Sequence, residues 1–114
     1  MGFGLNKMMV IGHLGRDPEM RFTPNGKSVA YFSIAHKHTW KNIDGASQTH
    51  TEWFNVISWG NLAEDVKQTL KKGDLAYVEG RLQSRSWEDE KGCEQISVEI
   101  IANEIINLSG NQTI

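Results

Sequence analysis

The chain has 114 residues, a hydrophobic share of 39%, a charged share of 23% and a formal net charge of −2. This length allows one modest hydrophobic core, and the composition lies near the globular average, which excludes disordered and fibrous classes. The near-neutral charge excludes anion binding by bulk charge alone, so any anion-binding surface has to be a local concentration of Lys and Arg.

The N-terminal residues predict one bent strand followed by a tight turn. KMMVIGHLG, residues 7–15, is a short apolar run closed by a glycine, and RDPE then supplies a turn before MRFT. We expect this strand to bend at Gly12 or Gly15. TPNGK follows, and its Asn25-Gly26 pair is the strongest short hairpin signal in the chain because both residues tolerate a positive φ.

The second and third strands follow, separated by a polar loop. The second, residues 28–40, alternates an apolar face around Phe32 with a polar one. KNIDGASQ, residues 41–48, has no periodicity and is expected to be a mobile loop. The third strand, residues 49–60, has apolar side chains on both faces. This pattern is typical either of a strand buried on both sides or of one whose outer face is a binding platform.

Helical periodicity is confined to NLAEDVKQTLKKG, residues 61–73. Apolar residues recur at i, i+4 and i+8 from Leu62, and lysines occupy the last turn. Asn61 is the expected N-cap, with Glu64 three residues later as its capping-box partner. Gly73 is the expected C-terminal stop.

YVEGRLQSRSW, residues 77–87, predicts a strand with two unlike faces. One face carries Tyr77, Glu79, Arg81, Gln83, Arg85 and Trp87. The other collects Val78, Gly80, Leu82, Ser84 and Ser86, which are small or apolar enough to cover a core. Ordinary solvation explains the charged side chains but not the aromatic rings. After the turn DEKG, a fifth strand is expected, with one apolar face formed by Ile96, Val98, Ile100 and Ala102.

Three strands, one helix and two further strands match a small closed architecture. A five-stranded Greek-key barrel with its helix between strands 3 and 4 is the OB-fold, which binds oligonucleotides and oligosaccharides across one face. We therefore predict an all-β OB-fold protein with one domain over residues 1–114. The lone Cys93 fits a reducing compartment, and no apolar run approaches the ~20 residues of a membrane span, so a cytoplasmic protein is expected.

Catalytic and metal-binding motifs are not recognisable in the sequence. Of the four histidines, only His36 and His38 share a strand face, which is too few ligands for a zinc site. The chain has no nucleophile elbow, Walker loop or HExxH segment. We expect a binding protein without enzymatic activity, metal or cofactor.

The four tryptophans lie outside the predicted helix, near cationic residues. Any single Trp would equally suit a core, because Trp is highly buried on average. Rings interleaved with Lys and Arg are what single-stranded nucleic acid requires, since bases stack on rings while cations follow the phosphates. Duplex binding needs no exposed Trp, and no helix has the basic periodicity to enter a major groove.

The motifs LGRDPE, TPNG, TEW, LAE, LKKG, VEGRL and a Trp-acidic turn occur together over nearly all of residues 6–108. In this combination the chain resembles the bacterial single-stranded DNA-binding protein family. The resemblance implies an OB-fold core over about residues 6–108 and a homotetramer. It also implies a nucleoid-associated protein that coats single-stranded DNA during replication, recombination and repair.

The same resemblance implies roles for individual residues. Base stacking would come from Trp40, Trp53, Trp59 and Trp87. Backbone contacts would come from Lys7, Arg16, Arg21, Lys37, Lys41, Lys72, Arg81 and Arg85. Three positions depart from the family pattern: Phe54 replaces a His common at the subunit interface, and Asn55 and Asn61 replace residues that are often basic. A dimer is therefore the alternative assembly, and fewer ionic contacts are expected.

The C-terminal residues and the edge of the first predicted strand bear on which proteins the chain would bind. The sequence stops at SGNQTI, without the acidic tail that the family usually carries, so recruitment of proteins through a tail is not expected. The apolar edge of the first strand, between Met8 and Leu14, favours self-association.

Alternatives to DNA binding are a primosomal-type OB assembly factor working through protein contacts, and a nuclease on the same scaffold. The retained aromatic positions favour DNA binding, although stacking alone does not distinguish DNA from RNA.

Overall fold

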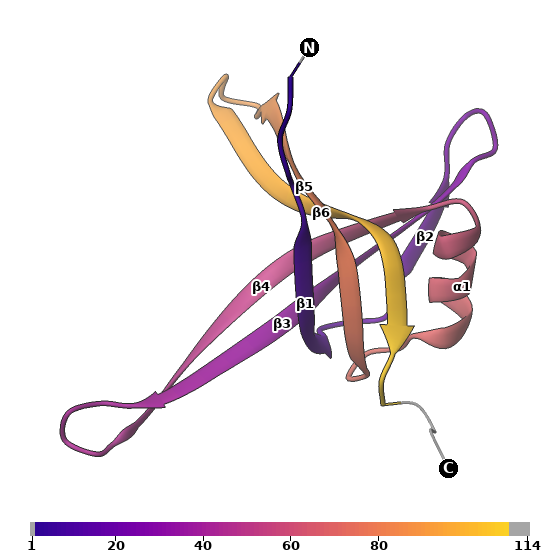
Figure 1. Ribbon diagram of the computed structural model, residues 1–114. Helices are drawn as coiled ribbons and strands as arrows, with labels where there is room; N and C mark the ends of the chain where they lie inside the picture. The colour runs from indigo at the N-terminus through magenta and orange to yellow at the C-terminus, as the bar shows by residue number, and fades with distance from the viewer. Residues whose placement is uncertain (1, 110–114) are drawn as a thin grey trace.

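The computed structural model describes residues 2–109, in which strands predominate (Figure 1). The elements in chain order are β1 Met8–Leu14, β2 Glu19–Phe22, β3 Ser28–Lys41, β4 Ser47–Trp59, α1 Asn61–Thr69, β5 Leu75–Glu88 and β6 Glu94–Asn107. β1 and β2 together take the place of the first predicted strand, which is interrupted after Leu14. The hairpin predicted at Asn25-Gly26 joins β2 to β3, and only Gly26 of the pair has a positive φ, 85°.

The sheet closes on itself through β1. Its hydrogen-bonded order is β1-β5-β6-β4-β3-β2, and β1 also pairs with β3. β4 and β6 run parallel at residues 55–57 and 99–101, whereas the other strand pairs are antiparallel. Counting β1 with β2, the result is a closed barrel of five strands. The helix α1 packs against β3, β4 and β6, in the predicted place between the third and fourth strands of the barrel (Figure 1).

The core lies inside the barrel and follows the two-residue period of the strands. Phe32 and Ile34 of β3 are buried, as are Val56 of β4 and Val66 of α1. The ambiguity of β4 is thereby resolved. Its Val56 face is internal, and the face that carries Trp53 points outward.

β6 departs from regular alternation at a bulge. The β5–β6 ladder shifts beside Gly80, so that Asn103 has no residue opposite it. An inserted residue reverses the inside and outside positions that follow it. The core-facing residues of β6 are therefore Ile100 and Ala102 before the bulge, and Ile105 packs against the core after it.

The β3–β4 and β5–β6 hairpins extend beyond the barrel as two arms (Figure 1). The predicted loop of residues 41–48 is shorter than expected, because β3 and β4 continue to residues 41 and 47. In the β5–β6 arm, the predicted core face is wrong. Leu82, Ile96 and Val98 are 39% to 66% exposed, and Ser84 and Ser86 are exposed as well. This part of the hairpin has left the barrel, so its inner face covers no core.

The helix begins and ends differently from the prediction. Its N-cap is Gly60, with φ of 64°, and no side chain caps it, so the predicted Asn61 cap is wrong. Glu64, the predicted capping-box partner, instead accepts a hydrogen bond from the Ser28 hydroxyl at 3.2 Å. The helix ends before Gly73, which lies in the following turn with φ of 88°.

At Gly80 the backbone of β5 lies close to that of β6. A Cβ at this position would overlap the Ile101 carbonyl oxygen and lie 2.8 Å from the Ala102 Cα. We expect Gly80→Ala to lower the free energy of unfolding by about 1–3 kcal/mol, the usual cost of overpacking. Equilibrium urea unfolding measures this change, with Gly4→Ala as a control because nothing lies within 4 Å of its added carbon. Equal stability of the two variants would contradict the close approach.

Candidate nucleic-acid interface

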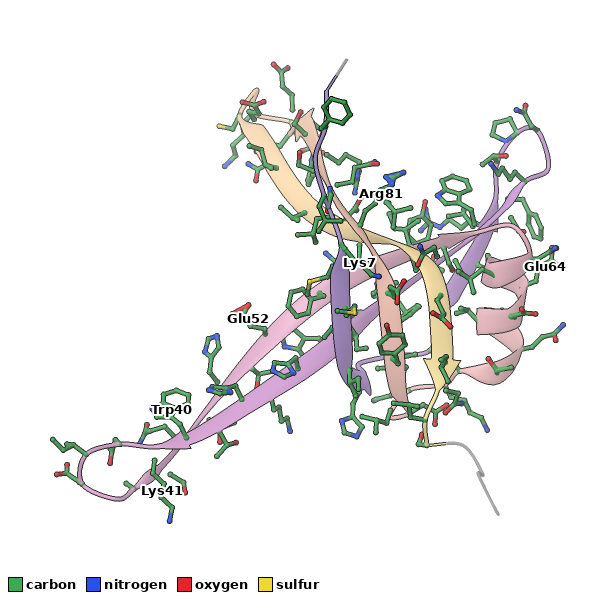
Figure 2. The ribbon with its side chains drawn as sticks, in the orientation of Figure 1. Lys7, Trp40, Lys41, Glu52, Glu64 and Arg81 are labelled. Carbon is green, nitrogen blue, oxygen red and sulfur yellow. The ribbon has the colours of Figure 1, made fainter. Side chains whose placement is uncertain are left out.

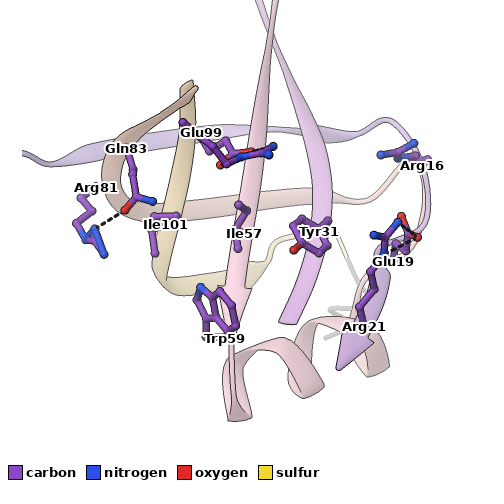
Figure 3. Close-up of a pocket in the computed structure, with 11 residues that line it drawn as sticks. Arg16, Glu19, Arg21, Tyr31, Ile57, Trp59, Arg81, Gln83, Glu99 and Ile101 are labelled. Atoms are coloured by element: carbon purple, nitrogen blue, oxygen red, sulfur yellow. Dashed lines mark hydrogen bonds and ion pairs between the residues drawn. The ribbon is translucent and has the colours of Figure 1, made fainter. Parts of the chain in front are cut away.

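An open groove of about 510 Å³ crosses the outer face of the barrel (Figure 3). Aromatic and aliphatic side chains from three strands line it, together with four arginines and two glutamates. The lining residues are Arg16, Glu19, Arg21, Tyr31, Ile57, Trp59, Arg81, Gln83, Arg85, Glu99 and Ile101. The groove is therefore locally cationic although the whole chain carries a net charge of −2.

Strand register brings these side chains together. One row crosses all the strands of the groove, because each of its members lies directly opposite the next. The row is Glu19, Tyr31, Ile57, Ile101 and Arg81, from β2 through β3, β4 and β6 to β5. Next to it, Gln83 of β5 lies opposite Glu99 of β6. Residues two apart share a strand face, so the alternation predicted for β5 places Arg81, Gln83 and Arg85 in the groove.

Two carboxylates hold arginines against aromatic rings. Arg21 pairs with Glu19 (Nη2 to Oε2, 2.8 Å), and its Cζ lies 5.7 Å from the centroid of the Tyr31 ring. The hydrogen bond between them lowers the pKa of Glu19 and raises the pKa of Arg21. On β5, Arg85 pairs with Glu99 in the same way and lies over Trp87. These arginines are thus oriented by a carboxylate and a ring together.

All four tryptophans are exposed in this chain, between 40% and 57%, so none of them is a core residue. Trp59 lies in the groove, with the Lys27 Nζ 5.2 Å from its ring centroid. Trp53 lies on the same face of β4 and covers Gly15, where an added Cβ would be 2.6 Å from the Trp53 Cζ3. The ring of Trp40 stacks on His38 at 5.6 Å between centroids.

The predicted cations lie in three places. Arg16, Arg21, Arg81 and Arg85 line the groove. Lys37 and Lys41 lie on the β3–β4 arm, where Figure 2 shows Trp40 and Lys41 far from Arg81. Lys7 and Lys72 are outside the groove: the Lys7 Nζ is 3.6 Å from the Glu79 Oε2, and the Lys72 amide donates to the Asp17 carboxylate at 2.8 Å.

Six of the residues that line the groove were not among the predicted site residues: Glu19, Tyr31, Ile57, Gln83, Glu99 and Ile101. Tyr31 had a signal, because it lies between the buried Ala30 and Phe32 and must therefore point outward. Lys27 over Trp59 and the buried Glu99 had none. Their positions depend on which residues of neighbouring strands are paired, and the sequence pattern does not specify that register.

The described part of the chain contains no group of three or more His, Cys, Asp or Glu side chains arranged to hold a metal ion. In residues 2–109 there is also no helix of the length and apolar character needed to cross a membrane.

A second, apolar hollow of about 460 Å³ lies beside β1. Its lining includes Met9, Ile11, Phe54 and Tyr77. Tyr77, which shares a strand face with Arg81 in the alternation pattern, therefore lies at this hollow and not in the groove.

The Tyr77 hydroxyl donates a hydrogen bond of 2.6 Å to the Glu79 carboxylate, which raises the pKa of Tyr77 to about 12. Because the ordinary value is 10.0, the bond stabilises the folded state fully below pH 10 and is lost as the pH rises towards 12. We expect phenolate absorbance to show one late-ionising tyrosine. Tyr77→Phe should remove that step, and Glu79→Gln should shift it towards pH 10. A late step that persists in Tyr77→Phe would contradict the assignment.

The chain is similar to known proteins over most of its length. The single-strand binding protein family model matches residues 5–108. Single-stranded DNA-binding proteins from two strains of Neisseria meningitidis, Z2491 and MC58, are 47% identical over 106 residues, covering 93% of this chain and 61% of theirs. Single-stranded DNA-binding protein 1 of Chlorobaculum tepidum is also 47% identical over 106 residues, covering 92% of this chain and 65% of that protein. The chain thus spans less than two thirds of the length of these relatives.

A solved structure supports the same relationship. The Plasmodium falciparum SSB complex with ssDNA superimposes with a TM-score of 0.88 at 28% sequence identity, covering 95% of this chain and 98% of that chain. The OB-fold predicted from the order of strands and helix is therefore confirmed. With the family model matching residues 5–108, the chain belongs to the single-strand binding protein family.

Proposed function

We propose that this protein binds and protects single-stranded DNA, without sequence preference, in bacterial replication, recombination and repair at the nucleoid. The observation that carries the proposal is the groove, where the rings of Tyr31 and Trp59 lie among four arginines. Bases stack on such rings while the cations follow the phosphates, which is how sequence-tolerant single-strand binding works. Members of the family are non-enzymatic DNA-binding proteins, and the similar P. falciparum protein was solved with ssDNA.

The proposed strand runs through the groove and onto both arms. In the groove, Trp59 and Tyr31 would stack bases, and Arg16 and Arg81 would contact phosphates. Beyond it, the strand would reach Trp87 on the β5–β6 arm. On the β3–β4 side it would meet Trp53 and Trp40, with Lys37 and Lys41 beside them as phosphate contacts. Arg21 would act at the groove, whereas Lys7 and Lys72 would contact only a strand that continues around the barrel.

We also propose that copies of the chain associate through β1, as a homotetramer or, more simply, as a dimer. β1 pairs with β3 only at His13 and Leu14, so residues 8–12 have an edge that no described strand of this chain covers. Met9 and Ile11 are exposed beside this edge, at the apolar hollow that includes Phe54. An open edge with apolar side chains is a template for pairing with a strand of another chain.

We expect oligo-dT to quench the tryptophan fluorescence and duplex DNA of equal length to bind far more weakly, because a duplex conceals its bases. Trp53→Ala and Trp87→Ala should each cost ~1–3 kcal/mol of binding free energy per engaged base. Phe22→Ala is the control, since this exposed ring follows Arg21 in β2 and therefore points to the other face. Equal affinity for both DNAs, or wild-type affinity in both folded Trp variants, would refute stacking. Oligo-U titration decides between DNA and RNA.

Light scattering at micromolar concentration should show a tetramer, or a dimer if the second interface is weak. Ile11→Glu places a charge beside the open edge of β1 and should reduce the mass of the assembly, because pairing would bury that charge. Ile43→Glu, at the fully exposed tip of the β3–β4 arm, should leave the mass unchanged. A stable monomer of the unmodified chain would reject self-association.

A further inference from the structure

Glu99 is a buried carboxylate in the wall of the groove that four arginines also line (Figure 3). It is only 5% exposed, and a buried charge is costly unless it is paired and hydrogen-bonded. Its partner is Arg85, whose Nη2 lies 3.0 Å from Oε2 and whose Nε lies 3.4 Å from Oε1. A two-point contact of this kind fixes the plane of the guanidinium as well as its position.

The same guanidinium lies over the ring of Trp87. The Arg85 Cζ is 5.0 Å from the ring centroid, which is within the range of a cation–π contact. The side chain of Arg85 is 57% exposed, and the ring of Trp87 is also exposed. Glu99, Arg85 and Trp87 therefore form a chain of contacts that runs from the buried floor of the arm to its exposed aromatic ring.

The ion pair changes what Arg85 offers to a phosphate. The negative charge of the Glu99 carboxylate balances the positive charge of the guanidinium before any DNA arrives. Its hydrogen bond raises the pKa of Arg85, so the guanidinium stays protonated and paired with Glu99. Because Glu99 is buried in the sheet, it cannot swing into solvent as the exposed Glu19 beside Arg21 can. The salt dependence of single-strand binding counts the phosphates that free cations neutralise, and Arg85 is not a free cation.

We propose that Glu99 is a positioning residue that cancels the charge of Arg85 and holds it against Trp87, so that Arg85 supports base stacking instead of contacting a phosphate. This inference rests on the proposed single-stranded DNA binding and refines it, because the family resemblance implies a backbone contact for Arg85. Arginine is suited to the role, since its planar guanidinium pairs with a carboxylate along one edge and stacks on an aromatic ring through its face.

A purely structural role for Glu99 makes a different prediction. In that case its replacement would lower stability and leave the salt dependence of DNA binding as it was. The slope of log affinity against log salt therefore separates the two roles. Glu99→Gln is the informative variant, because glutamine keeps the shape and an acceptor for Arg85 but removes the neutralising charge.

The experiment measures binding of a short oligo-dT, within the roughly 4–16 nucleotides that one OB fold covers, across a salt series. Glu99→Gln should steepen the slope by up to about 0.7, the contribution of one additional phosphate contact on a single strand. The double variant Glu99→Gln with Arg85→Gln should restore the wild-type slope. It should also bind more weakly than wild type at every salt concentration. In a protein that already carries Trp87→Ala, the same double substitution should cause no further loss of affinity.

Glu94→Gln is the matched control. It removes an equal charge from the same strand, but it lies opposite Glu88, on the face of the arm away from Trp87, and should leave the slope unchanged. Urea unfolding verifies that each variant is folded. If Glu99→Gln does not fold, the double variant decides alone, because it leaves no unpaired charge.

Two results would overturn the inference. A double variant whose slope is flatter than wild type by about 0.7 means that Arg85 contacts a phosphate despite Glu99. Identical slopes in wild type and folded Glu99→Gln mean that Glu99 acts only on the fold. The proposed function fails by a separate outcome, in which the wild-type protein does not bind oligo-dT or binds duplex DNA equally well.

Discussion

The close crossing of β1 over β3 is the constraint on which the rest of the structure depends. Any side chain at Gly12 would overlap the Ala35 carbonyl oxygen, so only glycine lets β1 reach β3 while it remains paired with β5. Gly80 permits an equally close approach of β5 to β6. The pairing of β1 with β3 closes the barrel. The groove lies across the outer faces of the neighbouring strands β3, β4, β6 and β5.

Within that groove, the contacts that each arginine already makes matter more for binding than the number of arginines. Arg21 and Arg85 each contact a carboxylate and a ring, whereas Arg16 and Arg81 make no contact of that kind with the groove carboxylates. The groove thus contains two arginines that are each held by a carboxylate and a ring, and two that are not. A near-neutral protein can bind a polyanion in this way, since the charge that matters is the charge left unpaired at the surface.

The sequence pattern was sufficient where one local rule decides the structure. The two-residue period correctly assigned the buried face of β3 around Phe32, and helical spacing located α1. It was insufficient where tertiary context decides. The bulge at Asn103 reverses the faces of β6, and the exposure of Ile96 depends on how far the hairpin extends beyond the barrel. The pairing of Glu99 with Arg85 depends on cross-strand register, which no single segment of the sequence specifies.

In the proposed complex, single-stranded DNA lies along the groove with its bases stacked on exposed aromatic rings. Ultraviolet cross-linking of bound oligo-dT, followed by mass spectrometry of the linked peptides, tests it most directly because it reports which rings contact bases. Cross-links are expected at Tyr31 and Trp59 in the groove and at Trp87 on the β5–β6 arm. Cross-links confined to Tyr77 or Phe22, which lie neither in the groove nor on an arm, would contradict this path.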